Sequence, residues 1–396
     1  MPAASISRSS FPLLLAWPGL LALAVAMGIG RFAFTPLWPL MAHDAGLSLA
    51  QGGWLASANY AGYLLGALAA VAFPIRRLRA GLLGSLAAAG LLTLAMGQLD
   101  GMAAWLALRL AAGYASAYTF ICVAAWRPVS AGDPREGPVM NWTYAGVGIG
   151  IAASGLACLV LMQRGASADA SWRALGMLAL AASALVAAAL VRAPAPAPAA
   201  RAKPAKHATQ GLSQASPGGE RGARWLVLHY GLFGMGYIVP ATFLPAMAKA
   251  QVSDPAVFGW VWPCFGAAAA VSCLLAPRLA RGRDERRIWR AAQLLMAAGM
   301  AAPALLDSLG ATALAALLVG GTFVVITQAG MQAARRSVGG NAARAAAAMT
   351  AAFALGQILG PLAAAWAARH GIGLPAVLAA SAALLAAGAL ALPQRA

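Results

Sequence analysis

The sequence predicts an all-α membrane protein with twelve transmembrane helices in two six-helix pseudo-repeats. Of its 396 residues, 61% are hydrophobic and only 10% are charged, whereas soluble globular proteins carry about 25% charged residues. Long apolar stretches alternate with short polar loops, and basic residues gather in every second loop. Because so little charge could not cover the surface of two or three soluble domains, that class of protein is excluded.

The lengths of the apolar stretches predict the individual helices. A helix needs about 20 mostly apolar residues to cross a bilayer, and charge clusters and turn residues mark where each stretch ends. The expected spans of the first half are 13–42, 51–73, 81–99, 101–126, 139–163 and 172–192. Those of the second half are 225–248, 256–279, 288–306, 309–332, 344–369 and 371–392.

A segment of different composition separates the two sets of spans. Residues 193–224 are rich in Pro, Ala, Gly and basic residues and contain almost no large apolar side chain. Such a segment cannot form a hydrophobic core, which predicts a cytoplasmic linker. We therefore expect an N-terminal bundle over 1–192, the linker over 193–224 and a C-terminal bundle over 225–396.

The loop charges predict the orientation in the membrane. The formal net charge is +18, from 28 Lys and Arg against 10 Asp and Glu. With the N-terminus inside, the only basic residues in outside loops are Arg164, Arg173, Lys249 and Arg369. This distribution obeys the positive-inside rule, so both termini are expected in the cytoplasm. Apart from Arg31 and Arg109, which lie within spans, the other basic residues are spread over inside loops without interleaved aromatic residues, so no nucleic-acid partner is expected.

A weak internal repeat relates the two halves. At an offset near 206, Gly28 recurs as Gly234, Pro39 as Pro245, Gly53-Trp54 as Gly259-Trp260, and Gly150 as Gly356. Since each copy holds six spans, an even number, both copies insert in the same direction. The repeat predicts two halves related by an axis along the membrane normal.

Together these features resemble the major facilitator superfamily. The segments Met27-Gly-Ile-Gly-Arg-Phe-Ala-Phe-Thr-Pro-Leu-Trp-Pro-Leu-Met41 and Gly53-Trp-Leu-Ala-Ser-Ala-Asn-Tyr-Ala-Gly-Tyr-Leu-Leu-Gly66 are similar to its YbfB/YjiJ branch. The resemblance implies a major facilitator fold in the bacterial inner (cytoplasmic) membrane. Arg109 is similar to an arginine of proton-coupled members. The loop after the second span, with Arg76, Arg77 and Arg79, lacks the aspartate of the superfamily's gating motif.

Two arginines and an asparagine are expected at one depth in the bilayer. Arg31 lies eight residues before Pro39. Arg109 lies seven or eight residues into its span, and Asn59 lies eight residues after Gln51. At 1.5 Å per residue, each is about 12 Å from the outer end of its helix. Because an ionisable residue within a bilayer is costly, these residues predict one polar layer of a central site.

We expect this layer to bind an anionic group. Arg31 and Arg109 would attract the anion, and neighbouring polar groups would supply hydrogen bonds. The candidate substrate-binding residues are Arg31, Asn59, Tyr63, Arg109, Tyr144, Tyr237, Trp262 and Gln357. The alternative is structural: an arginine bonded to backbone carbonyls would lock the N-terminal bundle, and Asn59 would join two helices.

Glycines predict where helices approach one another closely. Because glycine has no side chain, two backbones can come into contact where it lies. The candidates for helix packing and gating are Gly28, Gly30, Gly66, Gly148, Gly150, Gly356 and Gly360.

The favoured function is secondary active transport of a small solute by alternating access. The cationic layer favours an organic anion. The alternatives are a drug or metabolite efflux antiporter of the same fold and a non-transporting membrane sensor or channel. The sequence shows no ATP-binding loop, nucleophile–base pair or metal-ligand cluster, so we expect no enzyme activity, catalytic residue, metal or cofactor.

The sequence leaves the identity of the coupling ion undecided. Protons could be coupled through Arg109 or through the outer acidic residues Asp44, Asp100 and Asp307, or transport could be uncoupled. The expected partners are the small-molecule substrate and the lipid bilayer, with the protein as a monomer.

Overall fold

In this computed structural model, the described residues are 12–73, 75, 77–126, 128–129, 133–192, 217–337 and 342–392. All regular structure in these residues is helical. The first half contains α1 (Pro12–Leu23), η1 (Ala24–Ile29), α2 (Phe34–Asp44), α3 (Leu49–Ala72), α4 (Leu78–Ala95), α5 (Met102–Ala125), α6 (Glu136–Gln163) and α7 (Ala168–Arg192). The second half contains α8 (Pro217–Gln251), α9 (Pro255–Phe258), α10 (Val261–Leu279), α11 (Glu285–Leu305), α12 (Leu309–Ser337), α13 (Ala342–Arg369) and α14 (Leu374–Ala391).

These elements confirm the predicted fold class of twelve spans. The first span is built from α1, η1 and α2, and the eighth from α9 and α10. Of the predicted linker 193–224, residues 193–216 lie outside the described residues. Helix α8 begins at Pro217, inside the predicted linker and eight residues before the expected start of its span.

Length and composition alone mark ten of the twelve spans as able to cross a membrane, counted over the described residues. The two others are α3 and α11. Helix α3 carries Gln51, Ser57 and Asn59, and α11 begins with three charged residues followed by a further arginine. Their polar side chains are used inside the protein: Asn59, for example, is fully buried.

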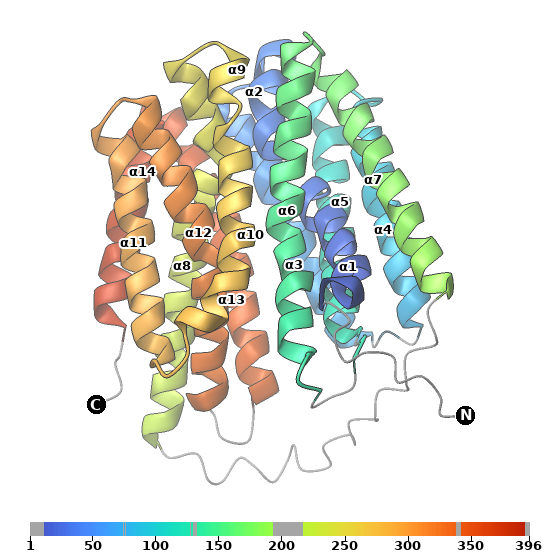
Figure 1. The fold of residues 1–396 in the computed structure, drawn as a ribbon. Helices are drawn as coiled ribbons and strands as arrows, with labels where there is room; N and C mark the ends of the chain where they lie inside the picture. Colours follow the sequence, from blue (N-terminus) through green and yellow to red (C-terminus); the bar gives the residue numbers. More distant parts are fainter. Residues whose placement is uncertain are drawn as a thin grey trace.

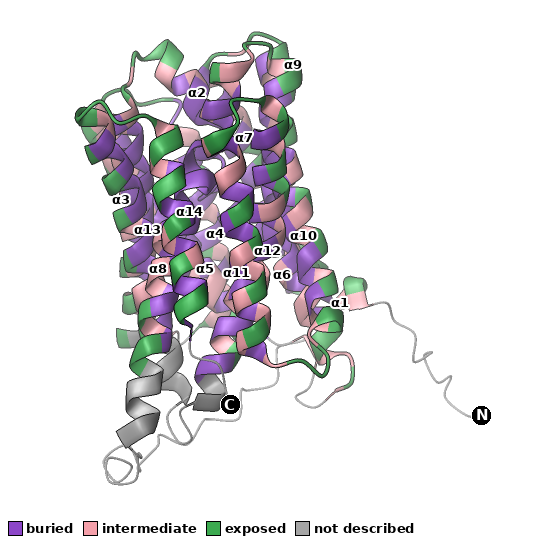
Figure 2. Ribbon diagram, turned by 90° about the vertical axis from the view of Figure 1, so that its left-hand side faces the viewer, coloured by how far each residue is buried: buried purple, intermediate pink, exposed green. Residues whose placement is uncertain are grey.

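The helices form two bundles that lie side by side (Figure 1). We call the end at which α2 ends and α3 begins the upper end, and the end at which α1 begins and α14 ends the lower end. The bundles contact each other mainly where α6 packs on α10 and α3 packs on α13. Buried residues line the helix faces that point into the molecule (Figure 2).

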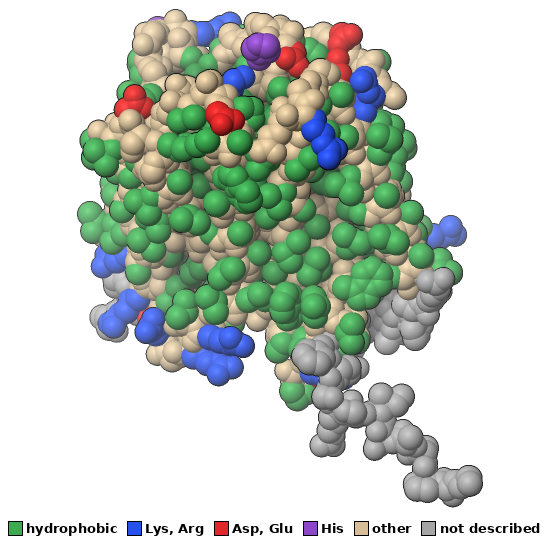
Figure 3. Space-filling model, turned by 45° about the horizontal axis from the view of Figure 1, so that its top comes forward, with side chains coloured by type: hydrophobic (Ala, Val, Ile, Leu, Met, Phe, Trp, Pro, Cys, Tyr) green, Lys and Arg blue, Asp and Glu red, His purple; other side chains and the backbone are tan. Residues whose placement is uncertain are grey.

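The outer surface fits a multi-pass membrane protein. In Figure 3 a broad band of hydrophobic side chains separates charged residues at the upper end from those at the lower end. A band of this kind matches the hydrocarbon core of a bilayer, in which charged side chains are costly.

The predicted repeat is visible in the helix boundaries. Helices α3 and α9 begin at Leu49 and Pro255, α6 and α13 begin at Glu136 and Ala342, and α7 and α14 begin at Ala168 and Leu374. The two starts of each pair are 206 residues apart, which is the offset of the predicted repeat. The same offset separates Thr35 from Ala241, to which Thr35 is hydrogen-bonded across the bundles. The two halves therefore share one plan over most of their length.

Candidate functional site

The first span is interrupted in its middle, and Arg31 lies at the interruption. The π-helix η1 ends at Ile29, a short turn follows, and α2 begins at Phe34. Pro36 has no N–H to donate to the carbonyl of Phe32, and its ring would clash with that carbonyl in a regular helix. The backbone N–H of Thr35 donates to Phe32 instead, at 3.1 Å. Breaks and π-bulges of this kind are frequent at functional sites.

The side chain of Arg31 joins the two bundles. Its guanidinium is 2% exposed, and Nη2 donates to Oε1 of Gln357 on α13 at 2.6 Å. The amide of Gln357 then donates from Nε2 to the hydroxyl of Tyr237 on α8, also at 2.6 Å. Arg31 and Tyr237 occupy equivalent positions of the repeat, so Gln357 links the two equivalent residues.

Aromatic rings surround the guanidinium of Arg31. Its carbon atom lies 4.0 Å from the ring centre of Tyr63, 4.9 Å from that of Tyr60 and 5.3 Å from that of Phe32. Cation–π contacts lower the cost of burying the charge. They do not satisfy the hydrogen bonds: Nε and Nη1 are buried without a partner, and no described acidic side chain forms an ion pair with Arg31.

Arg109 has a different role in the structure. It is equally buried, but Nη2 donates to the backbone carbonyl of Arg31 at 3.2 Å, and its guanidinium lies 4.7 Å from the ring centre of Phe34. Asn59 donates from Nδ2 to the carbonyl of Arg109 at 2.9 Å. The predicted layer is thus present, and within it Arg109 and Asn59 mainly hold α3 and α5 to the broken first span.

Hydrogen bonds close the bundles together above this layer. Thr35 Oγ1 donates to the carbonyl of Ala241 at 2.9 Å, and the hydroxyls of Tyr60 and Thr242 lie 3.2 Å apart. Nearer the upper end, Lys249 Nζ on α8 donates at 2.9 Å to the carbonyl of a proline in α2. Helices α2 and α8 are equivalent segments of the repeat. At the upper end the two bundles are therefore joined by hydrogen bonds between equivalent segments, next to the predicted axis between the halves.

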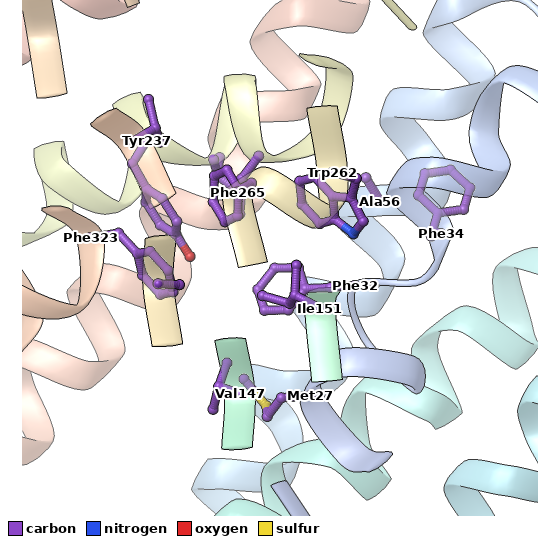
Figure 4. Packing of buried hydrophobic residues seen from close by; sticks show 14 of the residues in the cluster. Met27, Phe32, Phe34, Ala56, Val147, Ile151, Tyr237, Trp262, Phe265 and Phe323 are labelled. Atoms are coloured by element: carbon purple, nitrogen blue, oxygen red, sulfur yellow. The ribbon is translucent and has the colours of Figure 1, made fainter. Parts of the chain in front are cut away.

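The C-terminal bundle faces Arg31 with a row of stacked aromatic rings. Trp262 lies 4.8 Å from Phe265, Phe265 lies 5.8 Å from Phe323, and Phe323 lies 5.8 Å from Tyr237, all between ring centres. Phe32 of the other bundle lies 6.4 Å from Trp262. Figure 4 shows these side chains together, with Phe32 opposite the row formed by Trp262 and Phe265.

The structure brings together seven of the eight predicted site residues, either at Arg31 or one contact away from it. Tyr144 is the exception: it packs on Phe120, with ring centres 5.7 Å apart, nearer the lower ends of α5 and α6. Sequence reasoning missed Phe32, Tyr60 and Thr242. Phe32 directly follows Arg31 in the sequence, and Tyr60 directly follows Asn59. Their positions beside two predicted site residues could have indicated them, because neighbours on a helix can reach the same centre.

The predicted glycines lie at close helix crossings. A methyl group on Gly28 would overlap the backbone of Gly150, and one on Gly356 would overlap the carbonyl of Gly231. These are equivalent crossings, of the first span with α6 and of α8 with α13. A methyl carbon added at the other positions would also meet neighbouring atoms. At Gly148 it would overlap the backbone of Ala270, and it would lie 2.6 Å from the Tyr114 carbonyl oxygen at Gly66, 2.7 Å from the Met235 carbonyl oxygen at Gly360 and 3.1 Å from Ser116 Oγ at Gly30.

The acidic residues considered for coupling lie at the upper end. Asp44 accepts a hydrogen bond from the backbone N–H of Ala168 at 2.8 Å, and Asp307 accepts one from Gln251 at 2.9 Å. Asp100 is exposed. In the part of the chain that the structure describes, no group of three or more His, Cys, Asp or Glu side chains could hold a metal ion.

Comparisons with known proteins agree with this architecture. The chain is similar to the crystal structure of a variant of the nucleoside transporter NupG, with 14% sequence identity and a TM-score of 0.73, over 96% of this chain and 98% of that one. It is also similar to the crystal structure of the D-xylose-proton symporter, with 14% identity and a TM-score of 0.73, over 96% of each chain. At this identity the likeness shows the fold alone.

Sequence comparison identifies the family. No curated protein matches the chain. The family described as "Uncharacterised MFS-type transporter YbfB" matches residues 23–392, nearly the whole chain. This multi-pass membrane protein, with its duplicated six-helix bundles and its central arginine, therefore belongs to the YbfB-type family of major facilitator superfamily transporters.

Proposed function

We propose that this secondary transporter moves a small organic anion across the bacterial inner membrane by alternating access, with both termini in the cytoplasm. One observation carries the choice of substrate class. Arg31 is a buried cation between the two bundles, and two of its nitrogens, Nε and Nη1, have no hydrogen-bond partner. A binding site for an anion needs such a group.

The energetics support this assignment. An unpaired charge buried in a protein costs several kcal/mol, and pairing with a hydrogen-bonded anion offsets this cost. A carboxylate fits the planar guanidinium through two parallel hydrogen bonds. Nη2, which bonds Gln357, belongs to both edges of the guanidinium that can form such a pair, so an anion held by two parallel hydrogen bonds would take Nη2 from Gln357.

The position of Arg31 couples binding to the arrangement of the bundles. Its present partner, Gln357, belongs to the opposite bundle. An anion bound at Arg31 competes for the same guanidinium, and so changes a bond between the halves. Above it, Thr35 and Tyr60 bond to α8, and these bonds must break for the upper end to open. Glycine crossings on both sides let the helices slide during such rocking.

The remaining alternatives make different predictions. An efflux antiporter for cationic drugs would face repulsion from Arg31, and a sensor or channel would show no substrate counterflow. No described acidic side chain forms an ion pair with Arg31, so a coupled proton would need a carrier elsewhere in the protein. The protein is proposed to act as a monomer, since both bundles that face Arg31 come from one chain.

Transport by the purified protein in proteoliposomes tests the proposal. With a panel of organic acids, sugars, nucleosides and cationic drugs as solutes, we expect counterflow of organic acids only. Arg31→Ala should lower it by about 100-fold, since the substrate loses a charge-assisted pair in a desolvated site. Arg31→Lys keeps the charge without the planar geometry and should lower it by about tenfold.

Arg173→Ala is the matched control for these variants. Arg173 also donates to a backbone carbonyl, that of Gly97, at 2.7 Å, but at the upper end and away from Arg31. Its loss should leave transport unchanged within about twofold. Normal counterflow by Arg31→Ala, or Arg31-independent transport of a neutral solute, would disprove the proposed substrate class.

A further inference from the structure

We infer that the anion is a monocarboxylate with a planar aromatic body and a hydrogen-bond acceptor at the end away from its carboxylate, as in a hydroxybenzoate. This inference rests on the proposed function and names the substrate class of the same site. Three features carry it: the position of Arg31 between the bundles, the rings on both sides, and the unpartnered indole N–H of Trp262.

The charge of the site fits one carboxylate. Arg31 lies in the middle of the boundary between the bundles, whereas Lys249, which also bonds across it, lies nearer the upper end. The guanidinium of Arg109, whose Nε is also buried without a partner, lies on the N-terminal side against the Arg31 carbonyl and Phe34. The C-terminal wall presents the rings of Trp262, Phe265 and Phe323. A second carboxylate pointing at these rings would be desolvated without a cation, at a cost of several kcal/mol.

The rings favour a flat substrate. Phe32 and Tyr63 belong to the N-terminal bundle, and Trp262 and Phe265 belong to the C-terminal bundle. The last two are nearly parallel, with an angle of 19° between their planes. In the closed arrangement the rings of the two bundles contact one another (Figure 4). A planar ring can replace such a contact by stacking between the two walls, whereas a bulky aliphatic body separates them further.

The third feature is the indole of Trp262. Its Nε1–H is buried and has no partner, on a side chain that is 1% exposed. Trp289, the other fully buried tryptophan of this bundle, donates from Nε1 to Gln293 at 2.7 Å. Burying an indole N–H without an acceptor costs about 1–3 kcal/mol. A hydroxyl or carbonyl oxygen on the substrate, carried at the end away from Arg31, would supply that acceptor.

Binding to the purified wild-type protein tests the charge and shape of the ligand. The probes are benzoate, 4-hydroxybenzoate, cyclohexanecarboxylate, benzamide and succinate, measured by thermal shift and by calorimetry. We expect 4-hydroxybenzoate to bind most tightly, then benzoate, with cyclohexanecarboxylate at least about fivefold weaker than benzoate because it lacks a flat face. Benzamide and succinate should each be at least about 30-fold weaker than benzoate.

Two tryptophan variants test the distal acceptor. Trp262→Phe keeps an aromatic ring and removes the N–H, so the affinity for 4-hydroxybenzoate should fall about fivefold while that for benzoate stays the same. Trp289→Phe is the matched control. It leaves the Gln293 oxygen unpaired, so it should lower the melting temperature without changing either affinity. If Trp262→Phe weakens both acids equally, the indole does not bind the distal oxygen.

The outcomes separate this inference from the proposed function. Arg31-dependent binding of succinate or an aliphatic acid, with no binding of benzoate or 4-hydroxybenzoate, overturns the aromatic class and leaves the anion proposal standing. Binding of neutral or cationic solutes in Arg31→Ala overturns both. Failure of both aromatic acids to bind at millimolar concentration also overturns the inference.

Discussion

The two halves of this protein share a backbone plan and differ in chemistry. At the repeat offset, Arg31 corresponds to Tyr237, Asn59 to Phe265 and Arg109 to Ala315. All six side chains are buried. The N-terminal half therefore supplies the cation and its supports, and the C-terminal half supplies aromatic rings. In the proposed transport cycle, the duplicated helices would provide the symmetric motion and the asymmetric side chains would distinguish the substrate.

The halves also differ in where a helix breaks. Pro36 in the first span corresponds to Thr242 in α8, which runs without a break from Pro217 to Gln251. The hydroxyl of Thr242 donates to the carbonyl of Ile238 at 2.7 Å, within an unbroken helix. The break at which Arg31 lies thus accompanies Pro36, whereas α8 continues as a helix through its own prolines, Pro240 and Pro245.

The largest expected effect tests the close glycine crossings that the two halves share. Gly150→Ala and Gly356→Ala each place a methyl group against backbone atoms of a neighbouring helix, which cannot give way as a flexible side chain can. Each should lower the free energy of unfolding by about 3 kcal/mol or more, measured by titration with SDS. Gly84→Ala is the control, since nothing lies within 4 Å of its added methyl group. A loss of stability in only one of the two variants would show that the two crossings are not equivalent.

The next effect tests the difference in backbone. Thr242→Pro adds a third proline to the continuous helix α8, between Pro240 and Pro245, and should cost about 3 kcal/mol of stability. The reciprocal change, Pro36→Thr, lies where the first span is already broken, and should change stability by less than about 1 kcal/mol. Equal losses in the two variants, measured in the same SDS titration, would contradict the role of the proline.

A smaller effect tests the closure above Arg31. Tyr60→Phe keeps the ring beside the guanidinium and removes the hydroxyl that pairs with Thr242 across the bundles. It should lower stability by about 1 kcal/mol and raise the alkylation rate of a cysteine placed at Thr35. Tyr63→Phe is the control because its ring is the nearest to Arg31, while no hydrogen bond of its hydroxyl is described. An unchanged alkylation rate in Tyr60→Phe would place the closure elsewhere.

The smallest effect concerns a loop in which the halves differ. Arg135 donates to Asp133 at 2.9 Å and lowers the pKa of that carboxyl to about 2, whereas glycine stands at the equivalent position 339. A lowered pKa stabilises the folded state above the unfolded value near 4. The difference in stability between wild type and Asp133→Asn should stay constant above about pH 5 and shrink between about pH 4 and 2. A difference that changes near pH 7 would point to another group.

Much of the fold could be predicted because the bilayer imposes simple rules. Span length follows from membrane thickness, and the repeat follows from residues such as Gly28 and Gly234. The predicted boundaries differ most from the structure at the start of α8 and at the end of α12, where helical hydrogen bonds continue past the apolar stretch into polar residues.

The sequence by itself determined that an arginine, an asparagine and a second arginine lie at one depth, since helical rise converts residue number into distance. Only the tertiary structure decided their roles. A guanidinium has five N–H groups, and which carbonyl, amide or ring it meets depends on helices distant in sequence. Arg109 met a backbone carbonyl and became a packing residue. Arg31 donates from Nη2 to Gln357 of the other bundle, and its nitrogens Nε and Nη1 have no partner.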